Sequence, residues 1–288
     1  MDWHDIRDPN DPELDRLAER YKLHPLHIED CRHRNQIAKV EPQDNYLFVV
    51  LKPVQLDEEH ELDISDLDLF VAADFVITVQ ETEWTSIDEL IGHVRQRAGR
   101  LRPDQVMHRI LDGVVDSYSP LLDRLSHRID ELQDEVLASP EPGVLEKVLG
   151  MKRALLGMRR VNANTRDVAN HLMRLEGDLI HADLQPFLRD VYDHVSRNLD
   201  LIETQRELLA SAVDIYLSGI SNRMSGVMKA LTVVSTLSLP AIVIAGIYGM
   251  NLRRLPFADH PHAWGIVTGL IGACCVLLLV LLRLLRLI

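Results

Sequence analysis

The hydrophobic and polar positions divide the chain into a mixed region, a helical region and two long apolar runs. In the first hundred residues, apolar runs of strand length alternate with patterns of helical period. The strand-like runs are Tyr46–Leu51, Leu67–Val71 and Phe75–Val79, and the helical patterns are Asp11–Tyr21 and Trp84–Arg97. This alternation predicts an α/β domain over residues 1–103, with strands buried by flanking helices.

From about Asp104 onward the apolar residues recur at the helical period. A helix is predicted over Asp104–Ala138, and Ser139–Gly143, with two prolines and a glycine, ends it. A second helix is predicted over Val144–Leu179, so residues 104–183 form a helical hairpin. After Pro186 there is no proline until Pro240. We therefore predict one helix over residues 184–248, on the order of 90 Å long.

The two apolar runs are long enough to cross a bilayer. Ala230–Leu252 and Ala263–Leu282 contain no charged residue, and a helix of about 20 apolar residues spans the hydrocarbon core. The predicted spans are residues 230–248 and 263–283, joined by an outer loop (249–262) and followed by a short tail (284–288). The pattern is typical of an α+β membrane protein with a soluble body.

Charge is distributed unevenly between the soluble body and the spans. The chain carries −13 and its last 61 residues carry +4, so the first 227 residues carry −17. Such a body repels nucleic acid and attracts cations. The opening MDWHDIRDPN has neither the basic start nor the apolar core of a signal peptide. We therefore expect the body to stay in the cytosol, with the hairpin of spans in the plasma (inner) membrane.

The first span contains hydroxyl and small residues, whereas the second is almost entirely aliphatic after Gly272. Thr232, Ser235 and Leu239 of the first span lie on one face of the helix. At spacings of three or four, the same stripe is extended by Met228, Ile242 and Gly246. Either the hydroxyls only bond backbone carbonyls and pack helices, or this face lines an aqueous path. Two spans cannot enclose such a path, so a pore requires a ring-shaped homo-oligomer. Asn251 would then present a ring of neutral carboxamides at the mouth, suited to a hydrated Mg²⁺.

Several segments resemble the CorA family of magnesium and divalent metal ion transporters. The hallmark is Tyr248-Gly249-Met250-Asn251 at the end of the first span. Further similar stretches, in the same order along the chain, are Leu23–Asp30, Asp66–Phe70, Phe187–His194 and Val227–Leu231.

The resemblance implies a homopentameric funnel with both termini in the cytosol. A long stalk helix would continue into a pore-lining first span, and Mg²⁺, or alternatively cobalt or nickel, would flow passively inward. Gly249, Met250 and Asn251 would form the selective mouth, and Met228 and Leu231 a constriction below Ser235, Leu239 and Ile242. Asp88, Asp190 and Asp214 would hold regulatory magnesium at subunit interfaces. The resemblance implies no organic cofactor, and the sequence contains no phosphate loop or catalytic motif.

Departures from the family pattern leave alternatives open. Ser225 and Ile242 replace an asparagine and a threonine, and Phe257 stands where many members have a glutamate. Together with His260 and His262, this keeps a zinc transporter of the same architecture under consideration. A membrane-anchored scaffold or sensor without transport is the alternative from another class. His24, His27 and Cys31 have a spacing that could bind a metal on a helix.

Overall fold

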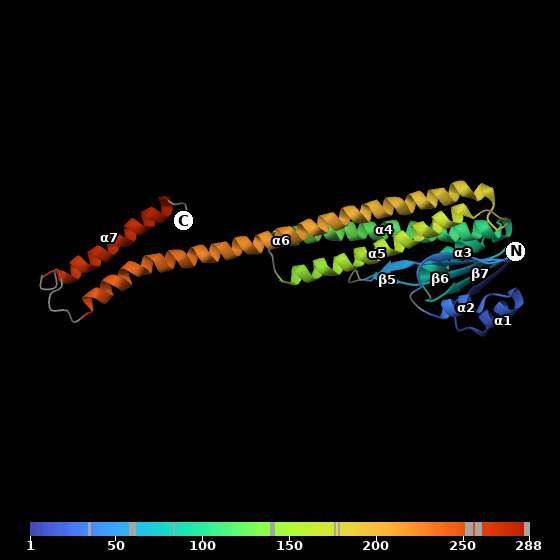
Figure 1. Cartoon of the computed structure of the whole chain (residues 1–288), viewed down its shortest axis with the longest axis horizontal. Helices are drawn as coiled ribbons and strands as arrows, with labels where there is room; N and C mark the ends of the chain where they lie inside the picture. The colour runs from blue at the N-terminus through green and yellow to red at the C-terminus, as the bar shows by residue number, and fades with distance from the viewer. Residues whose placement is uncertain are drawn as a thin grey trace. The chain divides into compact units, whose positions relative to one another are not determined.

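The computed structural model describes residues 1–33, 36–57, 62–82, 84–138, 142–175, 177, 179–250, 256 and 261–284 (Figure 1). Its contacts divide the chain into two compact units, Met1–Asp214 and Ile215–Ile288.

The first unit contains a five-stranded sheet in the order β1-β7-β6-β3-β2. Only β1 runs parallel to its neighbour β7, and the other pairs are antiparallel. A separate hairpin pairs β4 with β5. The strands are β1 (Asp2–Ile6), β2 (Lys39–Pro42), β3 (Leu47–Leu51), β4 (Val54–Leu56), β5 (Leu62–Ile64), β6 (Leu67–Val71) and β7 (Phe75–Gln80).

The three predicted strands are confirmed as β3, β6 and β7, the centre of the sheet. Every residue of these strands is buried, which explains their continuous apolar runs. Strands β1, β2, β4 and β5 were not predicted, because their residues alternate with polar or charged ones and β4 and β5 have three residues each.

Helices cover both faces of the sheet (Figure 1). On one face, α1 (Pro12–Tyr21) buries Leu14 and Leu17, and α2 (Pro25–Arg32) buries Ile28 and Cys31. All four belong to the core cluster that contains Phe48 and Phe70 of the sheet. On the other side, α4 (Pro103–Ala138) contacts β6 and β7, and α3 (Thr85–Arg95) packs on α4. Short 3₁₀ turns lie at η1 (Ala98–Arg100) and η2 (Ala182–Leu184).

The predicted helical hairpin is present as α4 and α5 (Pro142–Arg174), while most of its predicted break, residues 139–141, lies outside the described residues. The second helix was predicted to reach Leu179 but ends at Arg174. Gly177 and Ile180 instead form an isolated β-bridge, and glycine is a poor helix former. The buried Asp104 then accepts a hydrogen bond from the His181 backbone N–H at 3.1 Å, which fixes the chain before the next helix.

The predicted long helix is confirmed as α6 (Gln185–Tyr248), a single helix of 64 residues. Pro186 lies in its first turn, as predicted. Helix α7 (Ala263–Leu284) follows. Helix α6 with its preceding turn (Ala182–Tyr248) and α7 are both long and apolar enough to cross a membrane, and their most apolar windows are almost wholly unburied in the single chain.

Candidate cation sites

Three metal-ligating side chains come together between α4 and α6 in the first unit. Asp112 and Asp116 stand one turn apart on α4, and His194 approaches from α6. One ligand atom from each lies within 4.8 Å of the others. His194 Nδ1 is 3.6 Å from Asp116 Oδ1. Two carboxylates and an imidazole are a donor set that divalent cations accept.

Asp190, a predicted regulatory residue, lies at the edge of this cluster. It stands one turn before His194 on α6, and its Oδ2 is 3.7 Å from His194 Nε2. The imidazole therefore contacts a carboxylate on each side. The Asp190 side chain is 66% exposed, which leaves it accessible to a further ligand or to a neighbouring chain.

The electrostatics of the cluster favour added positive charge. Burial raises the pKa of Asp112, and the negative charges of Asp116 and Asp190 raise it further, against the opposing effect of His108 and His194. Carboxylates crowded in this way repel one another when all are ionised, and a bridging cation relieves that repulsion. The sequence search missed Asp112, Asp116 and His194. Two pairs of ligand-type residues spaced four apart, 112/116 and 190/194, are the signal that could have found them.

The other two predicted regulatory aspartates lie apart from these contacts. Asp88, in the first turn of α3, pairs with Arg7 at 3.3 Å and accepts a hydrogen bond from Gln80 at 3.4 Å. Asp214 is exposed on α6, and within the described residues it makes no ion pair. Their predicted role, holding a cation between subunits, stays a prediction.

The predicted pore residues form an exposed stripe on α6 in the second unit. Met228, Leu231, Leu239 and Ile242 are each more than half exposed, and Ser235 is exposed as well. Neighbouring hydroxyls bond the helix itself, since Thr232 donates to the Met228 carbonyl and Ser238 to the Val234 carbonyl, each at 2.8 Å. Among the described residues, no other element covers this largely apolar stripe.

Gly249 and Met250 end α6 in a tight turn, and Asn251 lies outside the described residues. The Gly249 N–H donates to the Ala245 carbonyl at 2.9 Å. A Cβ on Gly249 would lie 3.1 Å from that same oxygen, which is closer than ordinary van der Waals contact. A side chain at this position would push on the Ala245 carbonyl, which would have to shift by a few tenths of an ångström.

His24, His27 and Cys31 have other roles in the first unit. His24 precedes α2 and caps it by accepting from the Leu26 N–H. His27 is buried between Tyr46 and Glu41, at 2.9 Å from each, and Cys31 lies in the apolar core. Their contacts are structural, so the spacing does not form a metal site within the described residues.

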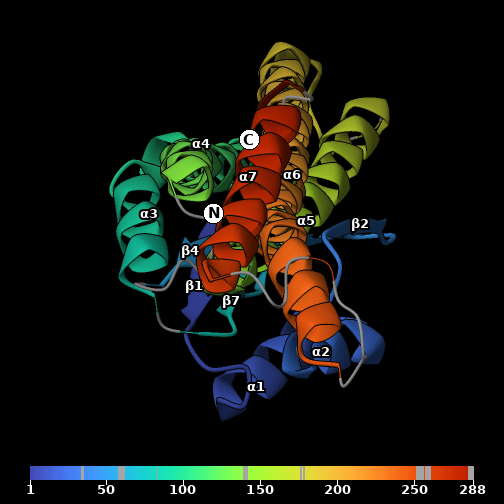
Figure 2. The same ribbon diagram turned by 90° about the vertical axis from the view of Figure 1, so that its left-hand side faces the viewer.

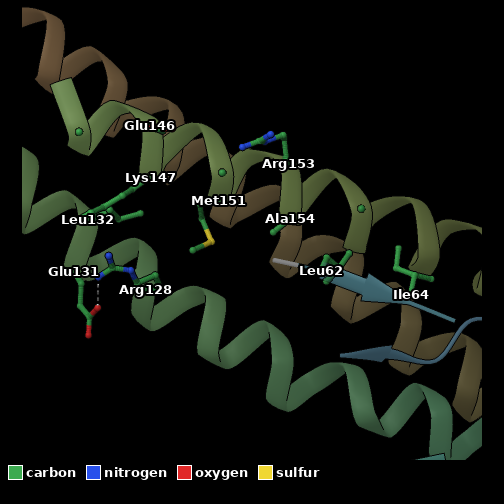
Figure 3. A pocket seen from close by; sticks show the side chains of 13 residues that line it. Leu62, Ile64, Arg128, Glu131, Leu132, Glu146, Lys147, Met151, Arg153 and Ala154 are labelled. Carbon is green, nitrogen blue, oxygen red and sulfur yellow. Dashed lines mark hydrogen bonds and ion pairs between the residues drawn. The ribbon is translucent and has the colours of Figure 1, made fainter. Parts of the chain in front are cut away.

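A groove of about 900 Å³ lies between β5, α4 and α5 (Figure 3). It is lined by Leu62, Leu132 and Met151 among others, with the Arg128–Glu131 ion pair at its edge. None of the predicted site residues lines it.

Comparison with known proteins identifies the family to which the chain belongs. The model of the CorA-like Mg²⁺ transporter protein family matches residues 1–286. The chain belongs to the CorA-like Mg²⁺ transporter family.

Individual CorA-like relatives are similar to this chain over most of their length. The cobalt/magnesium transport protein CorA of Thermotoga maritima is 34% identical over 271 residues, covering 93% of this chain and 77% of the relative. The divalent cation transporter CmaX of Pseudomonas aeruginosa is 25% identical over 231 residues, covering 78% and 69%. The complete structure of the CorA magnesium transporter of Methanocaldococcus jannaschii aligns with a TM-score of 0.86 at 26% identity, covering 98% of this chain and 89% of that one.

Membership in the CorA-like family identifies the class of protein and its architecture. It is a membrane-embedded divalent-cation transporter with an N-terminal cytosolic α/β domain and two C-terminal spans, and it is not an enzyme. The predicted family and fold class are confirmed.

Proposed function

We propose that the chain is a passive, channel-type transporter for Mg²⁺ in the plasma membrane, gated by cytosolic Mg²⁺, that works as a homopentamer with both termini in the cytosol. One observation carries this proposal. The single helix α6 bears Asp190 and His194 near one end and the exposed stripe from Met228 to Ile242 near the other. A helix of 64 residues is about 96 Å long, so in this proposal a shift at the cation cluster passes to the stripe along one continuous helix.

In this proposal each segment has one task. Residues 1–103 are the cytosolic α/β domain, 104–183 the helical hairpin, and 184–248 the stalk that becomes the first span. Residues 249–262 form the outer loop, 263–283 the second span and 284–288 the cytosolic tail. The bilayer and divalent cations are the only partners besides further copies of the chain.

The gate would respond to magnesium at the cytosolic cluster. A cation held by Asp112, Asp116 and His194, with Asp190 beside them, neutralises the crowded carboxylates. We assign Asp88 of an adjoining subunit and Asp214 to further cation contacts between subunits. When cytosolic Mg²⁺ falls, the cation leaves and the repulsion between carboxylates loosens the ring. The apolar constriction at Met228 and Leu231, closed by dewetting, then opens.

The outer mouth would select a hydrated ion. Amide oxygens of Asn251, which follows Gly249 and Met250 in the chain, would accept hydrogen bonds from the waters around Mg²⁺ without stripping them. The membrane potential supplies about 4.6 kcal/mol for a double charge at 100 mV. No organic cofactor is needed for this downhill flow.

An ion-selectivity series tests the function. Purified protein in liposomes, with an inside-negative potential, should admit Mg²⁺ in preference to Zn²⁺, Co²⁺ and Ni²⁺. Asn251→Ala should lower Mg²⁺ flux at least tenfold, whereas Asn251→Gln, which keeps the carboxamide, should lose less. Flux of Zn²⁺ without Mg²⁺ would instead support a zinc transporter, an alternative that His194 in the donor set favours. No flux of any ion, in parent or variant, would support a scaffold or sensor.

Regulation is tested at Asp190. Asp190→Ala should weaken Mg²⁺-dependent closure, because the cation loses a nearby negative charge, and should raise the Mg²⁺ concentration needed for protection from protease at least threefold. Asp193→Ala is the matched control, since Asp193 is exposed on the same helix and lies outside the cluster. Equal protection of the Asp190 variant and the parent would contradict the regulatory role.

A further inference from the structure

The two helices of the cytosolic hairpin carry opposite charges. Helix α4 has eight acidic and three basic residues, a net charge of −5. Helix α5 has seven basic and two acidic residues, a net charge of +5. Charge within one hairpin is therefore balanced, but the charged residues are not all paired with one another.

The outward face of α5 is basic and partly apolar. Leu149 and Leu156 are 49% and 44% exposed. Arg153 follows Leu149 by one turn and Arg160 follows Leu156 by one turn, and both arginines are exposed. Within the described residues neither arginine makes an ion pair. Figure 3 shows Lys147 directed from α5 toward α4, whereas Arg153, which also lines the groove, extends along α5. Leucines repeating every seven residues are typical of a helix face that packs on another helix.

The outward face of α4 is acidic. Asp123, Asp130 and Asp134 are exposed on it, at spacings of seven and four that keep them on one side of the helix. In the part of the chain that the structure describes, these three carboxylates make no ion pair. Figure 2 shows α4 and α5 on either side of the cytosolic part of α6, so the two outward faces belong to opposite flanks of the first unit.

The acidic residues of α4 and the basic residues of α5 lie at matching positions along the axis of the hairpin. Glu135 of α4 contacts Lys147 of α5 at 2.8 Å. Five residues back along α4 and five forward along the antiparallel α5 place Asp130 level with Lys152, next to Arg153. Twelve residues in each direction place Asp123 level with Arg159, next to Arg160. In a ring whose axis is parallel to the helices, the copies are related by rotation, which does not move a residue along that axis. The basic residues of α5 in one copy would therefore lie at the same positions along the axis as the acidic residues of α4 in the next copy.

We propose that the basic face of α5, formed by Leu149, Lys152, Arg153, Leu156 and Arg160, docks on the acidic face of α4, formed by Asp123, Asp130 and Asp134, of a second copy of this chain. The contact uses two different faces and is therefore heterologous, the kind of contact that closes into a ring. This inference rests on the proposed homo-oligomeric ring and adds the surface that joins its cytosolic parts.

Charge exchange in the full-length protein tests the contact. Arg153→Glu with Arg160→Glu, and separately Asp123→Lys with Asp130→Lys, should each lower the apparent association constant in detergent at least tenfold, measured by light scattering across a dilution series. The combined fourfold variant should recover to within threefold of the parent, because each reversed charge again faces its opposite. Arg16→Glu with Arg100→Glu, both exposed and outside these faces, makes the same change in net charge and should leave association unchanged.

The outcomes separate this surface from the proposed function. A ring-forming parent whose double variants associate equally well overturns the docking surface and leaves the ring intact. Weaker association of both double variants, without recovery of association in the fourfold variant, also overturns the docking surface. The two faces would then contact different partners, such as anionic lipid for α5. A parent that is monomeric in both detergent and native lipid overturns the ring itself.

Discussion

At the scale of single residues, the least expected group is a carboxyl in the apolar core. Asp68 stands on β6 opposite Val50 and Val79, and its carboxyl interacts with the Cys31 thiol. It is 2% exposed, and its Oδ1 has no hydrogen-bond partner in the described structure. Burial raises the pKa of Asp68 to about 7, although a hydrogen bond from the Cys31 thiol and the charge of Lys52 act in the opposite direction.

The consequence is a dependence of stability on pH near neutrality. The folded state holds the Asp68 proton up to about pH 7, whereas the unfolded chain releases it near 3.8. This proton therefore favours the folded state fully below pH 3.8, and its contribution is lost as the pH rises through 7, by up to about 1.4 kcal/mol per pH unit. Asp68→Asn, which cannot ionise, should lose less stability than the parent between pH 5 and 7 in thermal unfolding of the full-length protein.

The exposed Asp63 on β5 provides the control for this prediction. Asp63→Asn should keep the parental loss of stability between pH 5 and 7. The same slope in Asp68→Asn and in the parent would show that Asp68 is already ionised in the folded protein.

At the scale of elements, a glycine at the end of α6 lies close to the backbone of the preceding turn. The Ala245 carbonyl accepts the Gly249 N–H and lies 3.1 Å from where a Cβ would stand. The neighbour is backbone, which cannot move aside as a flexible side chain can. By contrast, a Cβ on Gly157 would meet only the end of the Leu62 side chain.

Gly249→Ala should therefore displace the turn that leads to Asn251 and lower Mg²⁺ flux in liposomes at least fivefold. Gly269→Ala on α7 serves as the control, because a Cβ there meets nothing within 4 Å and alanine is the better helix former. If both variants carry the parental flux, the tight turn at Gly249 has no part in conduction.

Within the first unit, buried amides fix the register of α6 against the hairpin. Gln205 donates to the Leu122 carbonyl of α4 at 3.0 Å, and Asn198 donates to Asn162 of α5 at 3.3 Å. These groups are nearly inaccessible to solvent, so a shift of α6 by one turn would leave polar atoms unpaired at about 1–3 kcal/mol each. This register brings His194 and Asp190 level with Asp112 and Asp116.

At the scale of the whole molecule, both candidate sites have exposed residues in the single chain. Asp190 has an exposed side chain, and the stripe from Met228 to Ile242 is exposed along its length. An apolar stripe of this kind is stabilised by contact with other membrane spans or with lipid. A pore requires that the stripes of several spans face one another.

We therefore expect the purified protein to have a mass of five chains of 32.8 kDa, once bound detergent is subtracted. Light scattering or native mass spectrometry measures this directly. Chelation of Mg²⁺ should change protease sensitivity without dissociating the assembly, because apolar packing of the spans does not depend on the cation. A monomer in both detergent and native lipid would rule out the channel.

The sequence by itself determined the elements whose signals are local. Continuous apolar runs identified β3, β6 and β7, the absence of proline identified α6, and long uncharged runs identified both candidate spans. The family followed from short segments in a fixed order, Tyr248–Asn251 above all. These features depend on residues adjacent in the chain, so no knowledge of packing was needed.

Tertiary structure alone decided which distant residues meet. Asp112 and His194 are 82 positions apart and come together only because α4 and α6 pack in one register. Polar pairs on helices usually face solvent, so spacing alone could not distinguish these from any exposed face. The same holds for Asp68, whose burial follows from the placement of α2 over β6, since the period of a strand tells which face a side chain occupies and not what covers that face.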